Sequence, residues 1–248
     1  MKKLCYVLIC VLSLVLFYGC GGNASASANN TENTEVQAEE GEGEEVTNSD
    51  ENADAKLNEE AVGEPIKDKA ELKRMSTFLS NFTELGMFDF TTEDLLKNPD
   101  DTRLIHFGIW HNYGNSFKTK VSSCSDSDCP HGSLVIDAKN VTETIKKYFD
   151  VDFKSHKSVK PDFDFYAEYL YYYDGKRYHF NGADGEATFF ARVKKASKDA
   201  SSQITMTGEL YNANDESEII GTFKALAKPY KYDGKDTWAI ISMANRFH

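Results

Sequence analysis

Apolar residues recur at helical spacing just after residue 65 of this chain. In IKDKAELKRMSTFLSNFTELG, residues 66–86, the positions Met75, Phe78, Leu79 and Phe82 follow an i, i+3, i+4, i+7 pattern. That spacing places the four side chains on one stripe of a helix. The segment is therefore predicted to be an amphipathic helix whose apolar face packs on the core.

Three further segments have helical patterns. TTEDLLKN (91–98) offers Thr92 as an N-cap, and VTETIKKYFD (141–150) has an apolar face. DDTRLIHFGIWHNYG (100–114) is apolar around nearly its whole circumference. Because a helix that is apolar all round has no face for water, the helix over 100–114 is predicted to be buried.

After Pro161 the pattern changes to strands and turns. Asp174-Gly175 lies between two aromatic-rich arms, and Asp233-Gly234 repeats the same turn chemistry, which is the usual signature of a hairpin. With a two-residue turn at Asp174-Gly175, Tyr173 would face Lys176. Four more strands are expected over 187–196, 201–212, 218–230 and 236–247.

This order of elements predicts the fold class. Helices followed by a meander of strands indicate an α+β domain, with N-terminal helices packed on a curved antiparallel sheet of about five or six strands. The order resembles that of cystatin-like or nuclear-transport-factor-like cones, a resemblance that covers most of the domain and rests on no motif. It bears on fold alone.

The N-terminus has the pattern of a targeting segment. Lys2 and Lys3 precede an apolar run from Leu4 to Tyr18, which is too short for a membrane-spanning helix of about 20 residues. Residues 1–19 are therefore predicted to be a signal peptide, which exports the rest of the chain.

The end of this segment, Leu16-Phe17-Tyr18-Gly19-Cys20, resembles the lipobox of bacterial lipoproteins. The resemblance implies cleavage before Cys20 and a lipid on its thiol, so that the protein is anchored in the bacterial cell membrane and faces outside the cytoplasm. Ordinary secretion, with cleavage at Ala24-Ser25-Ala26, is the alternative.

Composition separates a tether from a domain. From Thr31 to Pro65 there are thirteen acidic residues and one basic residue, so this stretch carries a net charge of −12, equal to that of the whole chain. Residues 20–65 are predicted to be a disordered acidic tether, and residues 66–248 a single globular domain. The domain has a net charge of −2, which argues against a nucleic-acid partner.

Export also bears on the cysteines. Cys124 and Cys129 are the pair left in the domain, separated by four small polar residues. Outside the cytoplasm such a pair favours a disulfide over two free thiols. A zinc site would need further ligands at suitable spacing, so neither a metal nor a cofactor is predicted.

Catalytic motifs are absent from the sequence, and the remaining candidates for acid–base chemistry are weak. His106 and His111 share a helix but lie about 140° apart around its axis, which favours a structural role. Asp162 and Asp164 would point the same way from a strand, without a third acid in register. An enzyme is therefore the less favoured interpretation.

The tyrosines supply a candidate binding surface. One face of the predicted hairpin must pack on the core, and the other could present rings to a sugar, peptide or protein, unless helices and loops cover both faces. The six residues are Tyr166, Tyr169, Tyr171, Tyr172, Tyr173 and Tyr178.

Two functional hypotheses follow. The favoured one is a lipid-anchored binding module of a bacterial envelope, which recognises a cell-wall polymer or an envelope protein. The alternative is an envelope enzyme with a pocket in the concave face of the sheet, using His106, His111 or the pair Asp162 and Asp164.

Overall fold

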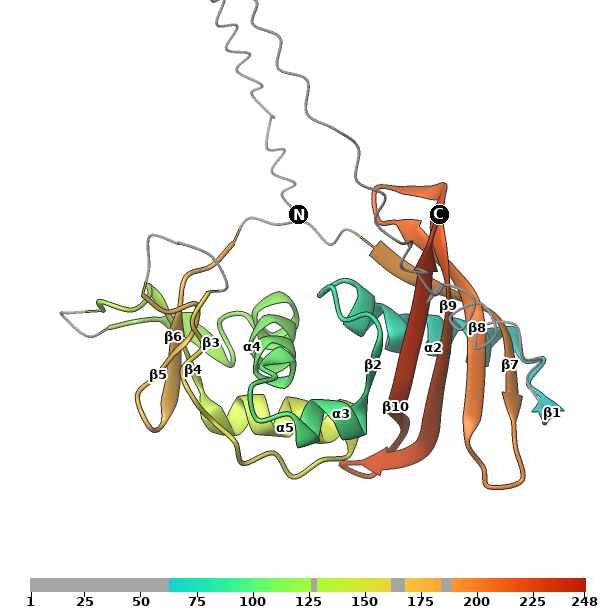
Figure 1. Ribbon diagram of the computed structural model, residues 1–248, viewed down its shortest axis with the longest axis horizontal. Helices are drawn as coiled ribbons and strands as arrows, with labels where there is room; N and C mark the ends of the chain where they lie inside the picture. The colour runs from blue at the N-terminus through green and yellow to red at the C-terminus, as the bar shows by residue number, and fades with distance from the viewer. Residues whose placement is uncertain (1–62, 126–128, 162–167, 184–188) are drawn as a thin grey trace, which may run out of the picture. The chain divides into compact units, whose positions relative to one another are not determined.

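The chain combines helices with two antiparallel sheets, one of six strands and one of four (Figure 1). The computed structural model describes residues 63–125, 129–161, 168–183 and 189–248. The α+β prediction is confirmed, but the strands divide between two sheets where the sequence predicted one. The predicted signal peptide, Cys20 and the predicted tether up to residue 62 lie outside the described residues.

The helices are α2 (Lys69–Thr83), α3 (Thr92–Lys97), α4 (Arg103–Ser116) and α5 (Ala138–Phe149). The large sheet has the order β1 (Glu64–Pro65), β7 (Phe189–Lys198), β8 (Ile204–Asn212), β9 (Asp215–Tyr232), β10 (Lys235–Phe247), β2 (Phe90–Thr91). The small sheet has the order β3 (Val121–Ser123), β4 (Leu134–Asp137), β6 (Arg177–Phe180), β5 (Tyr172–Tyr173). All four predicted helices are confirmed, and their ends differ from the prediction by no more than three residues.

Helix α2 buries the predicted apolar stripe and uses a second, polar face to bind the large sheet. Hydroxyl groups at three successive turns of α2 meet the backbone of β7. The hydrogen bonds are Val193 N to Ser76 Oγ (3.0 Å), Ala191 N to Ser80 Oγ (3.1 Å) and Thr83 Oγ1 to Phe189 O (2.9 Å). Strand β1 is short and pairs with Ser197 and Lys198 at one end of β7, so the rest of this edge of β7 has no neighbouring strand among the described residues. The hydroxyls of α2 bind the backbone groups of β7 that such a strand would otherwise pair.

Strand β1 shortens the predicted tether. Glu64 and Pro65 pair with β7, and the amide of Ile66 donates to Ala196 O at 2.9 Å. Proline is tolerated at a sheet edge because it has no donor to lose from the ladder. The prediction that the tether extends to Pro65 is therefore wrong at its last two residues.

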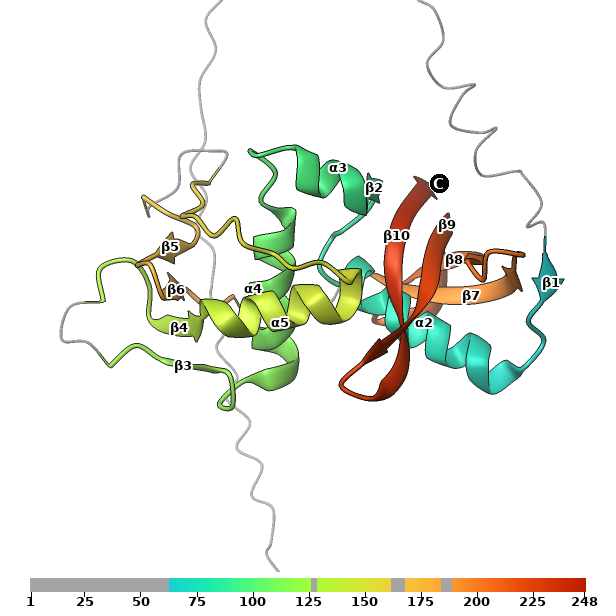
Figure 2. The same ribbon diagram turned by 90° about the horizontal axis from the view of Figure 1, so that it is seen from below.

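Helices α4 and α5 lie between the two sheets, as Figure 1 and the rotated view in Figure 2 both show. They approach closely at Gly108, where a Cβ would lie 2.5 Å from a methyl group of Val141. Helix α5 contacts β10 of the large sheet and β4 of the small sheet. The predicted burial of the helix over 100–114 is confirmed, since Leu104, Ile105 and Phe107 are each no more than 2% exposed.

The two predicted hairpin turns differ in outcome. Asp233 and Gly234 form a two-residue turn with φ of 49° and 73°, as predicted. At the other hairpin the turn passes through Gly175 and Lys176, and Tyr173 pairs with Tyr178 instead of Lys176. The reason is that the carboxylate of Asp174 accepts the amides of Lys176 and Arg177, at 2.8 and 2.6 Å, which moves the turn along the chain.

This change shifts the register by two residues, so each side chain keeps its predicted face. On its other side β6 pairs with β4, a strand that the sequence analysis did not assign. That pairing is why the hairpin belongs to a second sheet. Within the described part of the chain, the helices are too short or too polar to cross a membrane.

Candidate functional site

The small sheet carries a disulfide loop at one edge. Cys124 follows β3 and is bonded to Cys129, and both residues are half-buried. Gly132 returns the chain to β4 with a φ of 150°, and a Cβ at Gly132 would lie only 2.4 Å from the backbone nitrogen of Phe180. The loop lies directly against β6 at this point, and only glycine fits so near another backbone.

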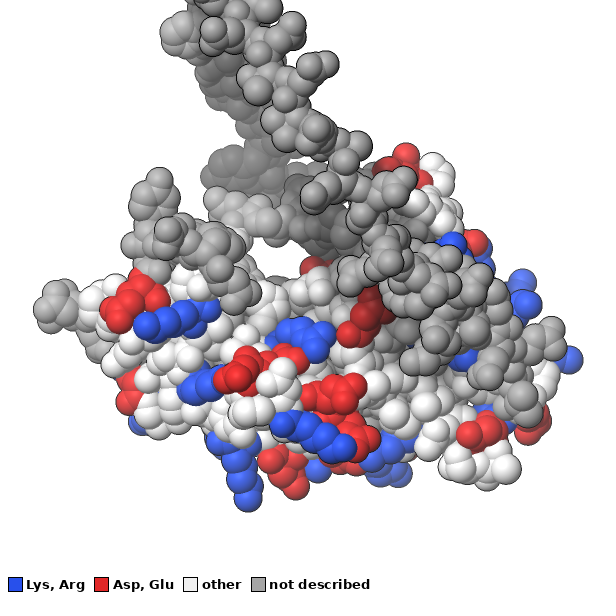
Figure 3. Space-filling model, in the orientation of Figure 1, with Lys and Arg blue, Asp and Glu red and all other residues white. Residues whose placement is uncertain are grey.

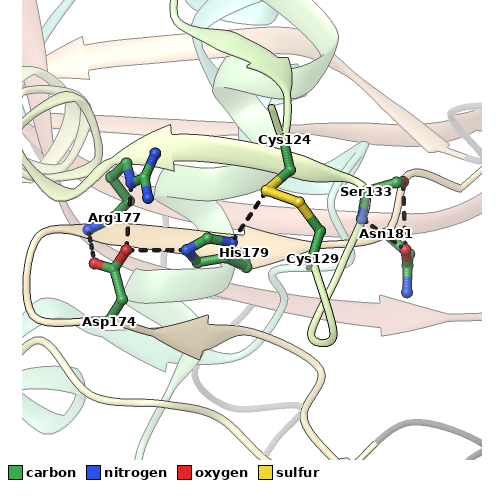
Figure 4. Close-up of a disulfide and its surroundings, with 7 residues drawn as sticks. All are labelled: Cys124, Cys129, Ser133, Asp174, Arg177, His179 and Asn181. Carbon is green, nitrogen blue, oxygen red and sulfur yellow. Dashed lines mark hydrogen bonds and ion pairs between the residues drawn. A yellow bond between two sulfur atoms is a disulfide. The ribbon is translucent and has the colours of Figure 1, made fainter. Parts of the chain in front are cut away.

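A histidine and a carboxylate lie beside the disulfide (Figure 4). His179 is only 7% exposed, and its Nδ1 lies 3.8 Å from Cys124 Sγ. Its other ring nitrogen, Nε2, lies 2.9 Å from Asp174 Oδ2. The imidazole of His179 therefore connects the carboxylate of Asp174 to the sulfur of Cys124. His179 and Cys124 are 55 residues apart in sequence.

Asp174 is held in its ionised form. Burial raises the pKa of its carboxyl, but hydrogen bonds from His179, from the amides of Arg177 and Lys176 and from the Arg177 side chain outweigh burial and hold that pKa well below its usual range. An ionised carboxylate only accepts hydrogen bonds, so Nε2 of His179 carries the hydrogen between them. In the neutral ring, Nδ1 then presents its lone pair to Cys124.

An aromatic cluster lies next to this group. The rings of Tyr169, Tyr172 and His131 are half-buried and in mutual contact, with centroids 3.9 Å apart for His131 and Tyr172 and 5.4 Å apart for the two tyrosines. Lys160 Nζ lies 5.7 Å from the centre of the Tyr169 ring. The ring of Tyr172 is 6.0 Å from that of His179, so the cluster lies next to the histidine that contacts the disulfide.

Only part of the predicted tyrosine surface is available to a ligand. Tyr171 and Tyr178 are 1% and 0% exposed, because their face of the hairpin packs on the core, so including them in a binding surface was wrong. Tyr173 is half-buried, and its hydroxyl donates to Gly175 O at 2.8 Å. Tyr166 lies outside the described residues.

His106 belongs to a buried polar group around Tyr171. The Tyr171 hydroxyl accepts from Trp110 Nε1 at 2.5 Å and lies 2.6 Å from His106 Nδ1. Burial lowers the pKa of His106, although a hydrogen bond to the backbone of Leu85 opposes that effect. The ring is therefore engaged in structural contacts.

His111 faces a different part of the molecule. It lines a polar cleft of about 280 Å³ together with Lys120 and Lys147, and His106 is not among the residues that line this cleft. Burial, and then the charges of Lys147 and Lys120, lower the pKa of His111 to about 4. Among the described residues, neither this polar cleft nor the larger cleft beside α2 is lined by both histidines, and Asp162 and Asp164 lie outside the described residues.

A larger cleft of about 580 Å³ opens where α2 meets the ends of β8, β9 and β10. It includes Trp238, which is 6% exposed and has the guanidinium of Arg74 5.0 Å above its ring. Among the residues that the structure describes, no group of three or more His, Cys, Asp or Glu could hold a metal ion.

Sequence reasoning missed His179 and Asp174 as members of the site. Asp174 was interpreted only as a turn residue, and His179 lies among aromatic residues in a strand, where nothing in the sequence connects it to Cys124. One feature of β6 could have indicated its orientation. His179 lies between Tyr178 and Phe180, which pack on the core, and successive side chains of a strand alternate, so His179 points to the opposite face. No known protein family, curated protein or solved structure matches this chain.

Proposed function

We propose that the chain is a lipid-anchored, extracytoplasmic binding module of a bacterial cell envelope. In this proposal the lipid on Cys20 holds the protein in the membrane, and the acidic segment up to residue 63 is the tether. The ligand is a cell-wall polymer or an envelope protein, and no catalytic step is required.

The observation that carries the binding proposal is the aromatic cluster of Tyr169, Tyr172 and His131. Three half-buried rings in mutual contact offer a large apolar area with polar tips, and such rings lose little entropy when a ligand covers them. The buried Tyr171 and Tyr178 hold the same hairpin on the core, so the cluster rests on a rigid support.

Charge is consistent with a neutral or mixed ligand. On the face seen in Figure 3, acidic side chains are interspersed with basic ones. A nucleic-acid partner would call for a basic stripe, since phosphate contacts dominate such binding. We therefore propose no nucleic-acid partner.

The finer architecture is also a proposal. Helix α2 packs against β7, and β7 to β10 form a meander, an arrangement like that of cystatin-like or nuclear-transport-factor-like folds. The alternative of an enzyme pocket in such a sheet is less favoured, because His106 is engaged with Tyr171 and His111 lines a separate cleft.

The test is a capture experiment with immobilised residues 48–248. The protein is exposed separately to solubilised envelope proteins and to purified cell-wall sacculi, and retained material is identified. Specific retention from one source is expected. Clean failure with both would contradict the binding proposal.

Paired variants locate the surface. The double variant Tyr169→Ala, Tyr172→Ala should weaken retention by about tenfold or more, as for aromatic anchors at interfaces. The matched control is Tyr230→Ala, Tyr232→Ala, a second half-buried tyrosine pair, whose centroids are 6.4 Å apart on β9. Tyr230 lines the larger cleft and Tyr232 lines the polar cleft, so loss of retention in the control pair alone would place the site at the clefts instead.

A further inference from the structure

Three groups lie in a row at the disulfide: the carboxylate of Asp174, the imidazole of His179 and the sulfur of Cys124 (Figure 4). They come from a hairpin turn, a central strand and the end of β3, so the fold alone brings them together. A disulfide that served only to close a loop would need neither an imidazole nor a fixed carboxylate beside it.

The row is polarised toward one sulfur. His179 Nδ1 lies 3.8 Å from Cys124 Sγ, so the imidazole is directed at this sulfur. Once protonated, the ring would present an N–H to Cys124 while Asp174 balances its charge. An imidazolium at this distance favours the thiolate form of a cysteine.

We propose that Cys124–Cys129 is an exchange-active disulfide that accepts electrons from external thiols, with His179 assisting the departure of Cys124. The substrate class is a low-molecular-weight thiol or a dithiol of another envelope protein. Asp174 is a positioning residue, because it acts by orienting His179 and stabilising its charge.

The thiolate of the external thiol attacks Cys129 Sγ and forms a mixed disulfide, while the bond to Cys124 Sγ breaks and its electron pair stays on Cys124. The proton that the external thiol lost is taken up at His179 Nδ1, and the imidazolium pairs with the Cys124 thiolate. A second external thiolate then attacks the external sulfur of the mixed disulfide, the bond to Cys129 Sγ breaks, and Cys129 takes up the proton of the second thiol. Two electrons and two protons have then passed to the protein, and the two external thiols leave as a disulfide.

Selective attack follows from the asymmetry. Exchange is faster when the leaving sulfur has the lower thiol pKa, and His179 Nδ1 lies against Cys124. With Cys124 as the leaving sulfur, Cys129 is the sulfur that the incoming thiol bonds. This activity does not rest on the binding function proposed above, since glutathione as substrate needs no aromatic surface.

The test uses the oxidised full chain in a mild detergent, with reduced glutathione at pH 7. Samples are quenched with acid, alkylated with N-ethylmaleimide and digested, and mass spectrometry quantifies glutathione on Cys124 and on Cys129 separately. In the unmodified protein, glutathione is expected mainly on Cys129. In His179→Ala, opening should be about tenfold slower and glutathione should divide between the two sulfurs.

Two further variants keep the test decisive. Asp174→Asn retains an oxygen that accepts the turn amides, and it should lose rate and selectivity in the same direction, so it decides the question if His179→Ala fails to fold. Asn181→Ala is the matched control, because Asn181 directly follows β6 and its loss removes hydrogen bonds from Ser133 without removing an imidazole. The control should open within about twofold of the unmodified protein. Equal rates and equal partition in the unmodified protein, His179→Ala and Asp174→Asn would overturn the proposal, as would glutathione mainly on Cys124.

Discussion

Removing the hydroxyl of Tyr171 tests the finding that this tyrosine is structural. In Tyr171→Phe the ring stays in place, but Trp110 Nε1 loses its acceptor and His106 Nδ1 loses its partner. Tyr171 is 1% exposed, so water has little access to the vacated position.

The magnitude follows from those two groups. A buried donor or acceptor left without a partner costs about 1–3 kcal/mol. Both partners are themselves half-buried, so each could recover some hydration, and the combined loss should be about 2–4 kcal/mol of unfolding free energy. Tyr173→Phe is the matched control in the same hairpin, because its hydroxyl bond to Gly175 is exposed and should be worth less than about 1 kcal/mol.

The assay is urea unfolding followed by tryptophan fluorescence for both variants and the unmodified protein. A midpoint that falls clearly for Tyr171→Phe and hardly for Tyr173→Phe is the expected result. Equal midpoints for the two variants would refute the reasoning, because the chemical change is the same and only the surroundings differ.

The remaining predictions concern pH, the sheet edge and the disulfide. The pKa of His111 is about 4 in the folded protein against 6.5 when unfolded, so the unfolded chain binds the proton first as pH falls. Stability should be complete above about pH 6.5 and fall by roughly 3 kcal/mol toward pH 4, and unfolding of His111→Phe measured across this range should show a flatter profile. Ser80→Ala leaves the amide of Ala191 without its acceptor and should cost about 1–3 kcal/mol in thermal unfolding, whereas an unchanged midpoint would mean that water replaces the hydroxyl. Replacing Cys124 and Cys129 together by serine opens a short loop and should cost about 2 kcal/mol in non-reducing urea unfolding, and no loss would show that the loop is held by other contacts.

Local patterns predicted the helices well and the small sheet poorly. The stripe of Met75 and Phe82 repeats at a period that only a helix can place on one face, so α2 could be predicted from neighbouring residues alone. Strands β3 and β4 are short and flank the cysteine loop, without an alternation long enough to identify them. Since the hairpin of β5 and β6 joins the small sheet through β4, an unassigned β4 left the hairpin without a sheet of its own.

The sequence by itself determined the helices, the α+β class, the Asp233-Gly234 turn and the presence of a cysteine pair in the domain, because each depends on residues that are close along the chain. The tertiary structure alone decided which tyrosines are buried and that His179 and Asp174 meet Cys124. The contact between His179 and Cys124 depends on the register of β6 with β4 and of β4 with β3. The contact between His179 and Asp174 depends on the turn that Asp174 sets by its hydrogen bonds. Moving that turn by one residue shifts every partner in the hairpin by two positions while leaving the local pattern unchanged.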